Sequence, residues 1–187
     1  SYLTVGIYLM ASYGLSRSEA LGIMRSDIDT VNKTIHIQRS VVKADGEVIV
    51  VNTKNKYRNR VIAVSDETIK LIVEDEQYLE KDFIVSPFGS AWSPAQFTWY
   101  FDELVRKLRE SGWDIPKVTP HGLRHSRASL WIAEDRNLFA IAEMLGWSDL
   151  EMLRQRYGHA DVEAIRQQLG IYPRHNFYSP RQNHDIN

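Results

Sequence analysis

Three short segments rich in β-branched residues lie close together in the middle of the chain, with helical patterns before and after them. Residues 34–42 alternate in part between apolar and polar side chains, which is typical of a half-buried strand. The Asp45-Gly46 pair predicts a hairpin turn, after which residues 48–51 form the returning strand. Residues 59–64 then predict a third strand. Three short strands in sequence predict a small antiparallel meander.

The rest of the chain is mainly helical in pattern. Residues 2–21 are broadly apolar and predict a buried helix, a turn at Gly14 and a second short helix that begins near Ser18. N-cap serine, proline at a first helical position and a terminal glycine mark the ends of later helices. We expect these at 65–75, 93–110, from 119 onward, 137–145, 148–157 and 161–169, with a brief strand at 83–85. The predicted fold class is mixed α+β, mainly α, with a small three-stranded antiparallel sheet.

Composition narrows the class of protein further. The 187 residues are 43% hydrophobic and 25% charged, as in soluble globular proteins, and no apolar run approaches the roughly 20 residues of a membrane span. Cysteine is absent, which excludes a disulfide framework and a thiolate metal site and favours a reducing, cytoplasmic location. After residue 172 the composition shifts to Pro, Arg, Asn, His and Ser. We therefore expect one domain over residues 1–170 and a tail over 171–187 that is mobile or docks on a partner.

The formal net charge is −1, so bulk charge gives no support to nucleic-acid binding. Local charge differs. Residues 31–60 hold seven lysines and arginines against two acidic residues, whereas residues 61–82 hold two against seven. Such asymmetry is consistent either with a basic face inside a neutral total or with two solvated faces of opposite sign.

Three groups of residues could act on a phosphate. His121 and Arg124 are three residues apart, so on a helix they share one face, where an arginine could clamp two oxygens and a histidine could move a proton. Tyr157 follows two arginines and could be a nucleophile if a base or positive surroundings activate its phenol. Lys54, in a basic hairpin loop, could protonate a leaving hydroxyl. Taken singly, each pattern is more typical of ordinary surface or packing residues than of a catalytic site.

The order of these features resembles the catalytic domain of the tyrosine recombinase (phage integrase) family. The resemblance extends through about Gly170 and rests on Gly14 to Glu19, Ser26 to Asp29, the lysine hairpin, Thr119 to His125, Leu145 to Trp147, and Tyr157. It implies the mainly helical tyrosine-recombinase catalytic fold. It also implies a DNA strand-transferase that performs site-specific recombination, such as integration and excision of a mobile element.

The resemblance implies a role for each motif residue. Tyr157 would attack the scissile phosphate, form a 3′-phosphotyrosine and release a 5′-hydroxyl. Arg124 would bind the non-bridging oxygens, and Lys54 would protonate the leaving oxygen. His121 would assist proton transfer, and Trp147 would donate its indole N–H to a phosphate oxygen where most relatives have histidine. No metal or cofactor is implied.

One position departs from the family pattern. The first catalytic arginine would follow Gly-Leu directly, but Ser16 stands there and Arg17 comes one residue later. A one-residue shift on a helix rotates the side chain by about 100°. Three explanations stay open: Arg17 reaches the site through a local backbone adjustment, the domain is impaired, or Ser16 is an engineered substitution. Glu19 would orient its neighbours.

The resemblance also implies partners. These are double-stranded DNA, further copies of the chain in a tetrameric synapse, and accessory DNA-bending proteins; no membrane is implied. An amino-terminal DNA-binding domain would normally precede this one, so we expect weak DNA binding by this chain alone. Two other interpretations remain: a DNA-binding relative of the same fold that does not cleave, suggested by Ser16, and an acidic helical interaction module, suggested by the net charge.

Overall fold

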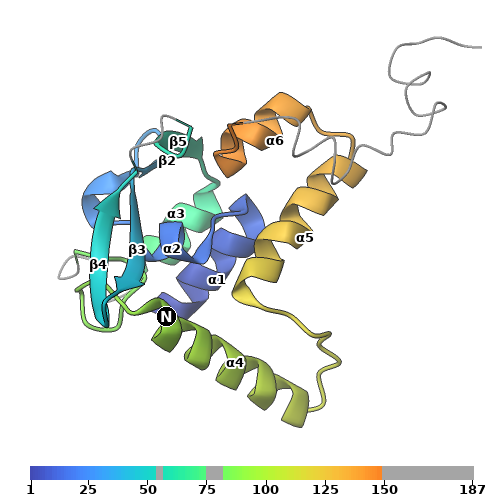
Figure 1. Cartoon of the computed structure of the whole chain (residues 1–187). Coiled ribbons are helices and arrows are strands. Elements are labelled where there is room, and N and C mark those ends of the chain that lie inside the picture. The colour runs from blue at the N-terminus through green and yellow to red at the C-terminus, as the bar shows by residue number, and fades with distance from the viewer. Residues whose placement is uncertain (54–56, 75–81, 149–187) are drawn as a thin grey trace, which may run out of the picture.

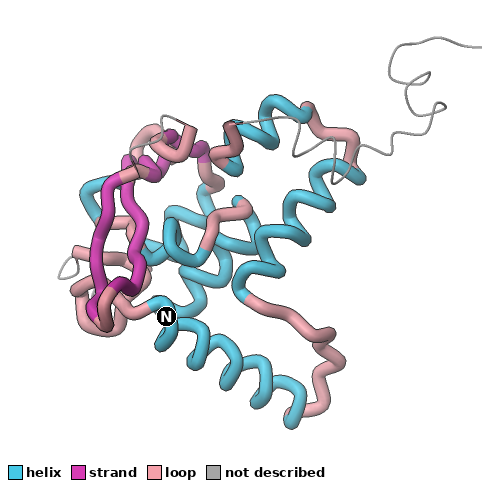
Figure 2. The backbone as a smooth tube through the Cα atoms, viewed as in Figure 1, coloured by secondary structure: helices cyan, strands magenta, loops and turns pink. Residues whose placement is uncertain are grey.

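The computed structural model describes residues 1–53, 57–74 and 82–148. Helix α1 lies in the middle of the molecule, with the strands to one side and α4, α5 and α6 around the others (Figure 1). The strands gather in one region of the backbone trace (Figure 2). In chain order the elements are α1 (Tyr2–Tyr13), α2 (Arg17–Leu21), the 3-10 turn η1 (Arg25–Asp27), β1 (Ile28–Asp29), β2 (Thr34–Ile37), β3 (Arg39–Ala44), β4 (Glu47–Asn52), β5 (Arg60–Ala63), α3 (Asp66–Val73), α4 (Pro94–Glu110), α5 (Pro120–Ala133) and α6 (Leu138–Leu145).

The mixed, mainly helical fold class is confirmed. The helices expected at 148–157 and 161–169, and the tail, lie outside the described residues. None of the described helices is both long and apolar enough to cross a membrane.

Local chemistry fixes most helix ends where the sequence predicts them. The side chains of Ser65, Thr119 and Asn137 each accept a hydrogen bond from a backbone N–H in the first turn of the following helix. Gly14 and Gly146 end α1 and α6 in the left-handed conformation, with φ of 66° and 65°. Helix α2 begins at Arg17, one residue before the expected start near Ser18, and its N-cap is Ser16.

The hairpin predicted at Asp45-Gly46 is confirmed, but the predicted three-strand meander is wrong. The three-stranded antiparallel sheet has the order β1-β2-β5, while β3 and β4 form a separate two-stranded hairpin. The segment 34–42 is therefore two strands, which divide at Gln38. There the Gln38 side chain donates to Asp27 (2.6 Å), and its carbonyl accepts from the backbone of Thr53 (2.9 Å). These contacts turn the chain out of the first sheet, so β5 pairs with β2 instead of β4. The segment at 83–85 forms only a bridge between Met24 and Phe83.

Most buried apolar residues form one core between α1, the three-stranded sheet and α4. Its largest fully buried side chain is Phe97 of α4, whose ring packs edge-on against Trp92 at 5.5 Å. A Cβ on Gly6 would come within 2.8 Å of the Phe97 ring, so α1 and α4 approach closely there. A second, smaller cluster joins α5 to α6 and consists of Ala128, Ile141, Ala142 and Leu145. With so little apolar surface, α6 depends on other contacts for its position.

Truncation of Phe97 tests the core. Phe97→Ala should lower the free energy of unfolding by about 3–5 kcal/mol, because it removes a buried ring and leaves a cavity between α1 and α4. Denaturant unfolding followed by circular dichroism measures the change. The matched control is Phe88→Ala, whose ring is 79% exposed and whose loss should change stability by less than about 0.5 kcal/mol. Equal effects of the two variants would contradict this assignment of the core.

Candidate active site

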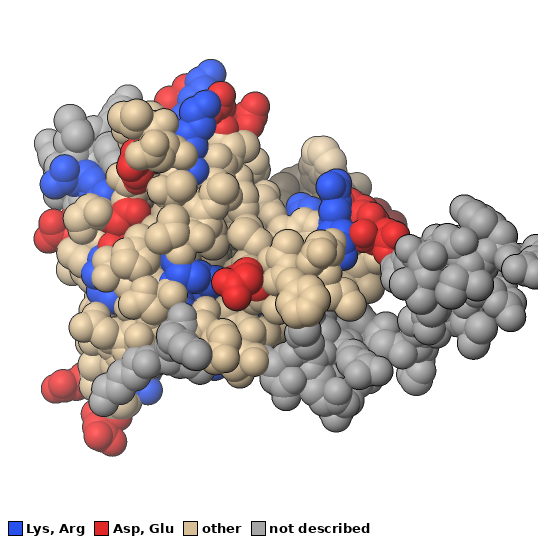
Figure 3. All heavy atoms as spheres, turned by 90° about the horizontal axis from the view of Figure 1, so that it is seen from above, with Lys and Arg blue, Asp and Glu red and all other residues tan. Residues whose placement is uncertain are grey.

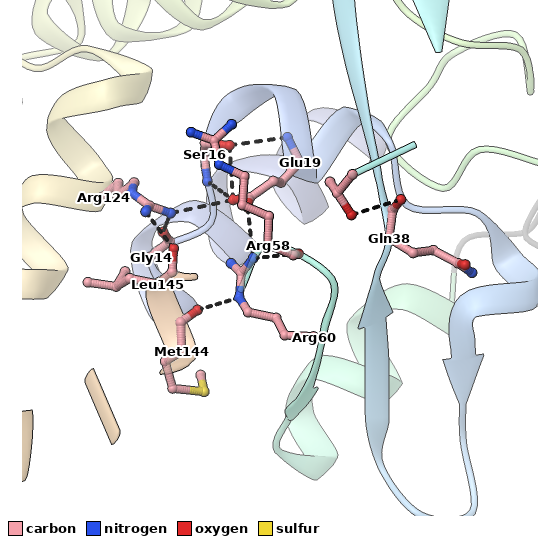
Figure 4. A network of polar contacts seen from close by, with 10 residues as sticks. Gly14, Ser16, Glu19, Gln38, Arg58, Arg60, Arg124, Met144 and Leu145 are labelled. Atoms are coloured by element: carbon pink, nitrogen blue, oxygen red, sulfur yellow. Dashed lines mark hydrogen bonds and ion pairs between the residues drawn. The ribbon is translucent and has the colours of Figure 1, made fainter. Parts of the chain in front are cut away.

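Arg124 lies at the centre of a polar cluster where four elements meet. Its guanidinium is buried, and Nη1 donates to the Gly14 carbonyl at 2.8 Å and approaches Glu19 Oε2 at 3.4 Å. Nη2 donates to the Leu145 carbonyl at 2.6 Å. Both carbonyls belong to the C-terminal ends of helices, α1 and α6, where unpaired carbonyls and the helix dipole favour a cation (Figure 4).

Glu19 of α2 is the carboxylate that these cations share. Its Oε1 accepts from Arg60 Nη1 at 2.8 Å, and its Oε2 accepts from the backbone N–H and hydroxyl of Ser16, each at 2.9 Å. Burial alone would raise the pKa of Glu19. The hydrogen bond from Arg60, the charges of Arg60 and Arg124, and the Ser16 N–H outweigh that effect and lower this pKa below its ordinary value.

Arg60, the first residue of β5, links Glu19 to the end of α6. Its Nε donates to the Met144 carbonyl at 2.9 Å, next to the Leu145 carbonyl that Arg124 binds. A Cβ on Gly146 would lie 2.7 Å from Arg60 Nη1 and 3.0 Å from the Tyr57 carbonyl, so only glycine lets the chain pass this closely. Two buried arginines thus fix the last turn of α6, which its small apolar cluster holds only in part.

Ser16, which stands where the family pattern has an arginine, has a structural role. Ser16 is the N-cap of α2 and forms a capping box with Glu19: its hydroxyl accepts from the Glu19 backbone, and the Glu19 carboxylate accepts from the Ser16 backbone. Arg17 lies elsewhere, since its Nη1 donates to the Thr98 hydroxyl on α4. The structure therefore does not bring Arg17 to the cluster around Arg124.

The other predicted site residues divide into three cases. Trp147 directly follows Gly146, and its ring centre lies 5.6 Å from the Arg124 guanidinium carbon. His121 lies in the first turn of α5 and is exposed, with its Nε2 2.8 Å from Nε2 of His125. Lys54 and Tyr157 lie outside the described residues.

Positive charge exceeds negative charge in this cluster. The guanidinium groups of Arg60 and Arg124 contact one carboxylate, and the charge of Arg58 also acts on Arg124. Burial lowers the pKa of Arg124, the charges of Arg60 and Arg58 lower it further, and Glu19 opposes them. The group remains a cation because arginine stays protonated in proteins. An anion that bound here would offset the repulsion between the guanidinium groups and compensate for the cost of their burial.

Sequence reasoning did not single out Arg58 and Arg60, although both lie in the basic segment that it counted. On the face shown in Figure 3, basic and acidic side chains are interspersed among uncharged ones. The arrangement suits a small anion with two oxygens that accept hydrogen bonds from guanidinium groups, such as a phosphate diester.

The model of the phage integrase family matches residues 2–164. The chain belongs to this family. It is 28% identical over 161 residues to the tyrosine recombinase XerA of Saccharolobus solfataricus, a match that covers 86% of this chain and 46% of XerA. It is 31% identical over 146 residues to the tyrosine recombinase XerC of Chlamydia pneumoniae, covering 76% of this chain and 42% of XerC. The chain thus spans about half the length of these relatives.

Its fold is also that of solved members of the family. The Tn1549 transposon integrase, in complex with transposon right end DNA, superposes with a TM-score of 0.75 at 20% identity, over 89% of this chain and 57% of that one. This similarity establishes the fold of the described elements.

Neutralising Glu19 tests the charge balance of the cluster. Glu19→Gln should lower the free energy of unfolding by about 3–5 kcal/mol near neutral pH, because two buried cations lose their shared carboxylate. The pKa of Glu19 is lower in the folded state, so its stabilising effect is present above the ordinary glutamate pKa and is lost as pH falls through the folded value. The difference between the two proteins should therefore shrink in acid.

Urea unfolding at several pH values from about 7 to about 3 measures this difference. The control is Glu143→Gln, an exposed glutamate on α6, which should change stability near neutral pH by less than about 0.5 kcal/mol. A gap between the unchanged protein and Glu19→Gln that stays constant with pH would contradict the proposed ionic role.

Proposed function

We propose that this chain is the catalytic domain of a site-specific DNA recombinase that cuts and rejoins DNA strands through a 3′-phosphotyrosine. The observation that carries the proposal is the excess of positive charge around Arg124, in a member of the phage integrase family. A scissile phosphate diester is a small anion, and its negative charge would balance the excess positive charge of this cluster. Relatives are named tyrosine recombinases, and the similar Tn1549 integrase is described in complex with DNA.

Arg124 would bind the scissile phosphate while it keeps its structural contacts. Three of its hydrogen-bond contacts go to Gly14, Glu19 and Leu145. A guanidinium has five N–H donors, so Nε–H and one Nη2–H have no partner among the described residues. Fixed donors of this kind stabilise charge that develops in a transition state, because they need no reorganisation during the reaction. Trp147, beside the guanidinium, would add an indole N–H.

The strand-transfer step would need two proton transfers. The Tyr157 oxygen would form a bond to phosphorus as the bond from phosphorus to the 5′-oxygen breaks. His121 would take the phenol proton, and Lys54 would give a proton to the leaving 5′-oxygen. Attack by another strand's 5′-hydroxyl on the phosphotyrosine reverses these transfers and rejoins the DNA. Arg17 has no role in these steps, because its side chain is hydrogen-bonded to Thr98.

The wider setting follows from the same proposal. Double-stranded DNA is the substrate, and integration or excision of a mobile element is the outcome. Strand exchange joins two duplexes that are each cut on two strands, which calls for a tetrameric synapse and, at some sites, DNA-bending proteins. In that synapse the tail, residues 171–187, would pack onto a neighbouring protomer. Deletion of these residues that left synapse assembly unchanged would count against this role.

A second function, DNA binding without cleavage, is favoured by one observation. Ser16 occupies the position of the expected arginine and is fully used in the capping box with Glu19. Loss of one phosphate-binding arginine would slow cleavage by about 10²–10³-fold, by analogy with the removal of one oxyanion-hole donor. One trapping experiment separates the two functions.

The experiment uses a nicked suicide duplex with the recombination site of the encoding element, and the protein that contains this chain. We expect a covalent protein–DNA adduct, seen as a band shift on a denaturing gel. Tyr157→Phe should abolish it, whereas Tyr100→Phe, at an exposed tyrosine of α4, should not. An adduct from Ser16→Arg alone would support the non-cleaving relative. Absence of adduct from both the unchanged protein and Ser16→Arg would contradict the proposed function.

A further inference from the structure

We infer that Arg58 supplies the second phosphate-binding guanidinium of this site, in place of the arginine missing at position 16. The inference rests on the proposed function and adds a residue to it. Arg58 lies in the loop before β5, 42 positions along the chain from Ser16. Moving the motif that contains Ser16 by one or a few residues along the sequence would therefore not identify Arg58.

The backbone at Arg58 is held against the site. Its carbonyl accepts a hydrogen bond from Arg60 Nη1 at 3.2 Å, and the same nitrogen is bonded to Glu19 at 2.8 Å. On the other side, the Tyr57 carbonyl lies 3.0 Å from where a Cβ of Gly146 would be. This part of the loop is therefore positioned by the buried cluster and by the end of α6.

The side chain extends from this loop toward Ser16, on the side of the cluster where Ser16 caps α2 (Figure 4). The charge of Arg58 also acts on Arg124 and contributes to the lowering of its pKa. Arg58 is exposed, and among the described residues its guanidinium has no hydrogen-bond or ion-pair partner. Its positive charge thus adds to that of the cluster, and no carboxylate among the described residues pairs with it.

The small side chain at position 16 suits this arrangement. Ser16 turns its hydroxyl toward Glu19 and places no charge in front of the cluster. A guanidinium that arrives from the loop can then lie opposite Arg124, and two cations can each bind one non-bridging oxygen of the phosphate. Arg17 cannot take this place while it is bonded to Thr98 on α4.

The test measures covalent trapping by the protein that contains this chain, on two suicide duplexes. One carries the natural phosphate at the cleavage position, and the other carries a methylphosphonate, in which a methyl group replaces one charged oxygen. Arg58→Ala should slow adduct formation on the natural phosphate by about 10²-fold, as loss of a transition-state donor does. On the neutral methylphosphonate the loss should be less than about fivefold, because less charge needs to be neutralised.

Two further variants sharpen the result. Arg58→Lys should recover part of the rate, and in a Ser16→Arg background Arg58→Ala should cost less than about fivefold, since the two guanidiniums replace one another. The matched control is Arg106→Ala, at an exposed arginine of α4 that pairs with Glu103 and Glu110, and it should leave both rates unchanged. Thermal unfolding of each variant verifies that it folds.

The outcomes are distinguishable. Equal losses of Arg58→Ala on the two duplexes, or no loss on either, would overturn the assignment of Arg58. Adducts formed only by Ser16→Arg variants would overturn it too, while the proposed cleavage chemistry would stand. If no protein with Tyr157 formed an adduct, the proposed function itself would fall, and the role of Arg58 with it.

Discussion

The described structure depends on the pairing and hydrogen bonding of one buried cation. The guanidinium of Arg124 is removed from water, and a buried charge is stable only when paired and hydrogen-bonded. Its partners come from three separate parts of the chain: the end of α1, the end of α6 and Glu19 of α2. Gly14 and Gly146 turn the chain in the left-handed conformation immediately after those helix ends. The carbonyls that a longer helix would use internally are therefore available to the arginine.

In the proposed function, this mode of assembly would couple folding to the binding of an anion. Glu19 balances only part of the positive charge, so the unliganded cluster retains repulsion between guanidinium groups. A ligand that binds the folded chain and not the unfolded chain stabilises the fold. The same charges that would stabilise a transition state thus also hold α6 in place. Residues 146–148 begin the connection from α6 toward Tyr157, so the geometry of the cluster determines where that connection starts.

Sequence reasoning succeeded where the determining chemistry is local. The caps at Ser65, Thr119 and Asn137 involve backbone groups two or three residues away, and a pattern of residues can therefore reveal them. The strand order of the sheet differs from the sequence-based prediction because its pairing depends on distant contacts. Nothing in the partly alternating pattern of residues 34–42 shows that contacts with Asp27 and Thr53 hold Gln38 out of the strand.

The site shows the same division. Arg124, His121 and Trp147 lie in motifs that a single sequence makes visible, whereas Arg58 and Arg60 are two of several cations in one basic segment. Only the fold shows that Arg60 is buried on Glu19 and that Arg58 extends toward Ser16 (Figure 4). A sum of charges could locate the segment but could not tell a structural arginine from one that is available to a ligand.

Position 16 brings the fold and the chemistry into competition. Serine there caps α2 and orients Glu19, and its replacement by a residue that cannot cap costs about 1 kcal/mol. Arginine would add a cation beside Arg124, but it would remove the hydroxyl that donates to Glu19 and increase repulsion in a cluster already rich in positive charge. A cation carried by the flexible side chain of Arg58 avoids this conflict. It supplies charge to the face of the site while the capping box, and with it the buried network around Arg124, stays intact.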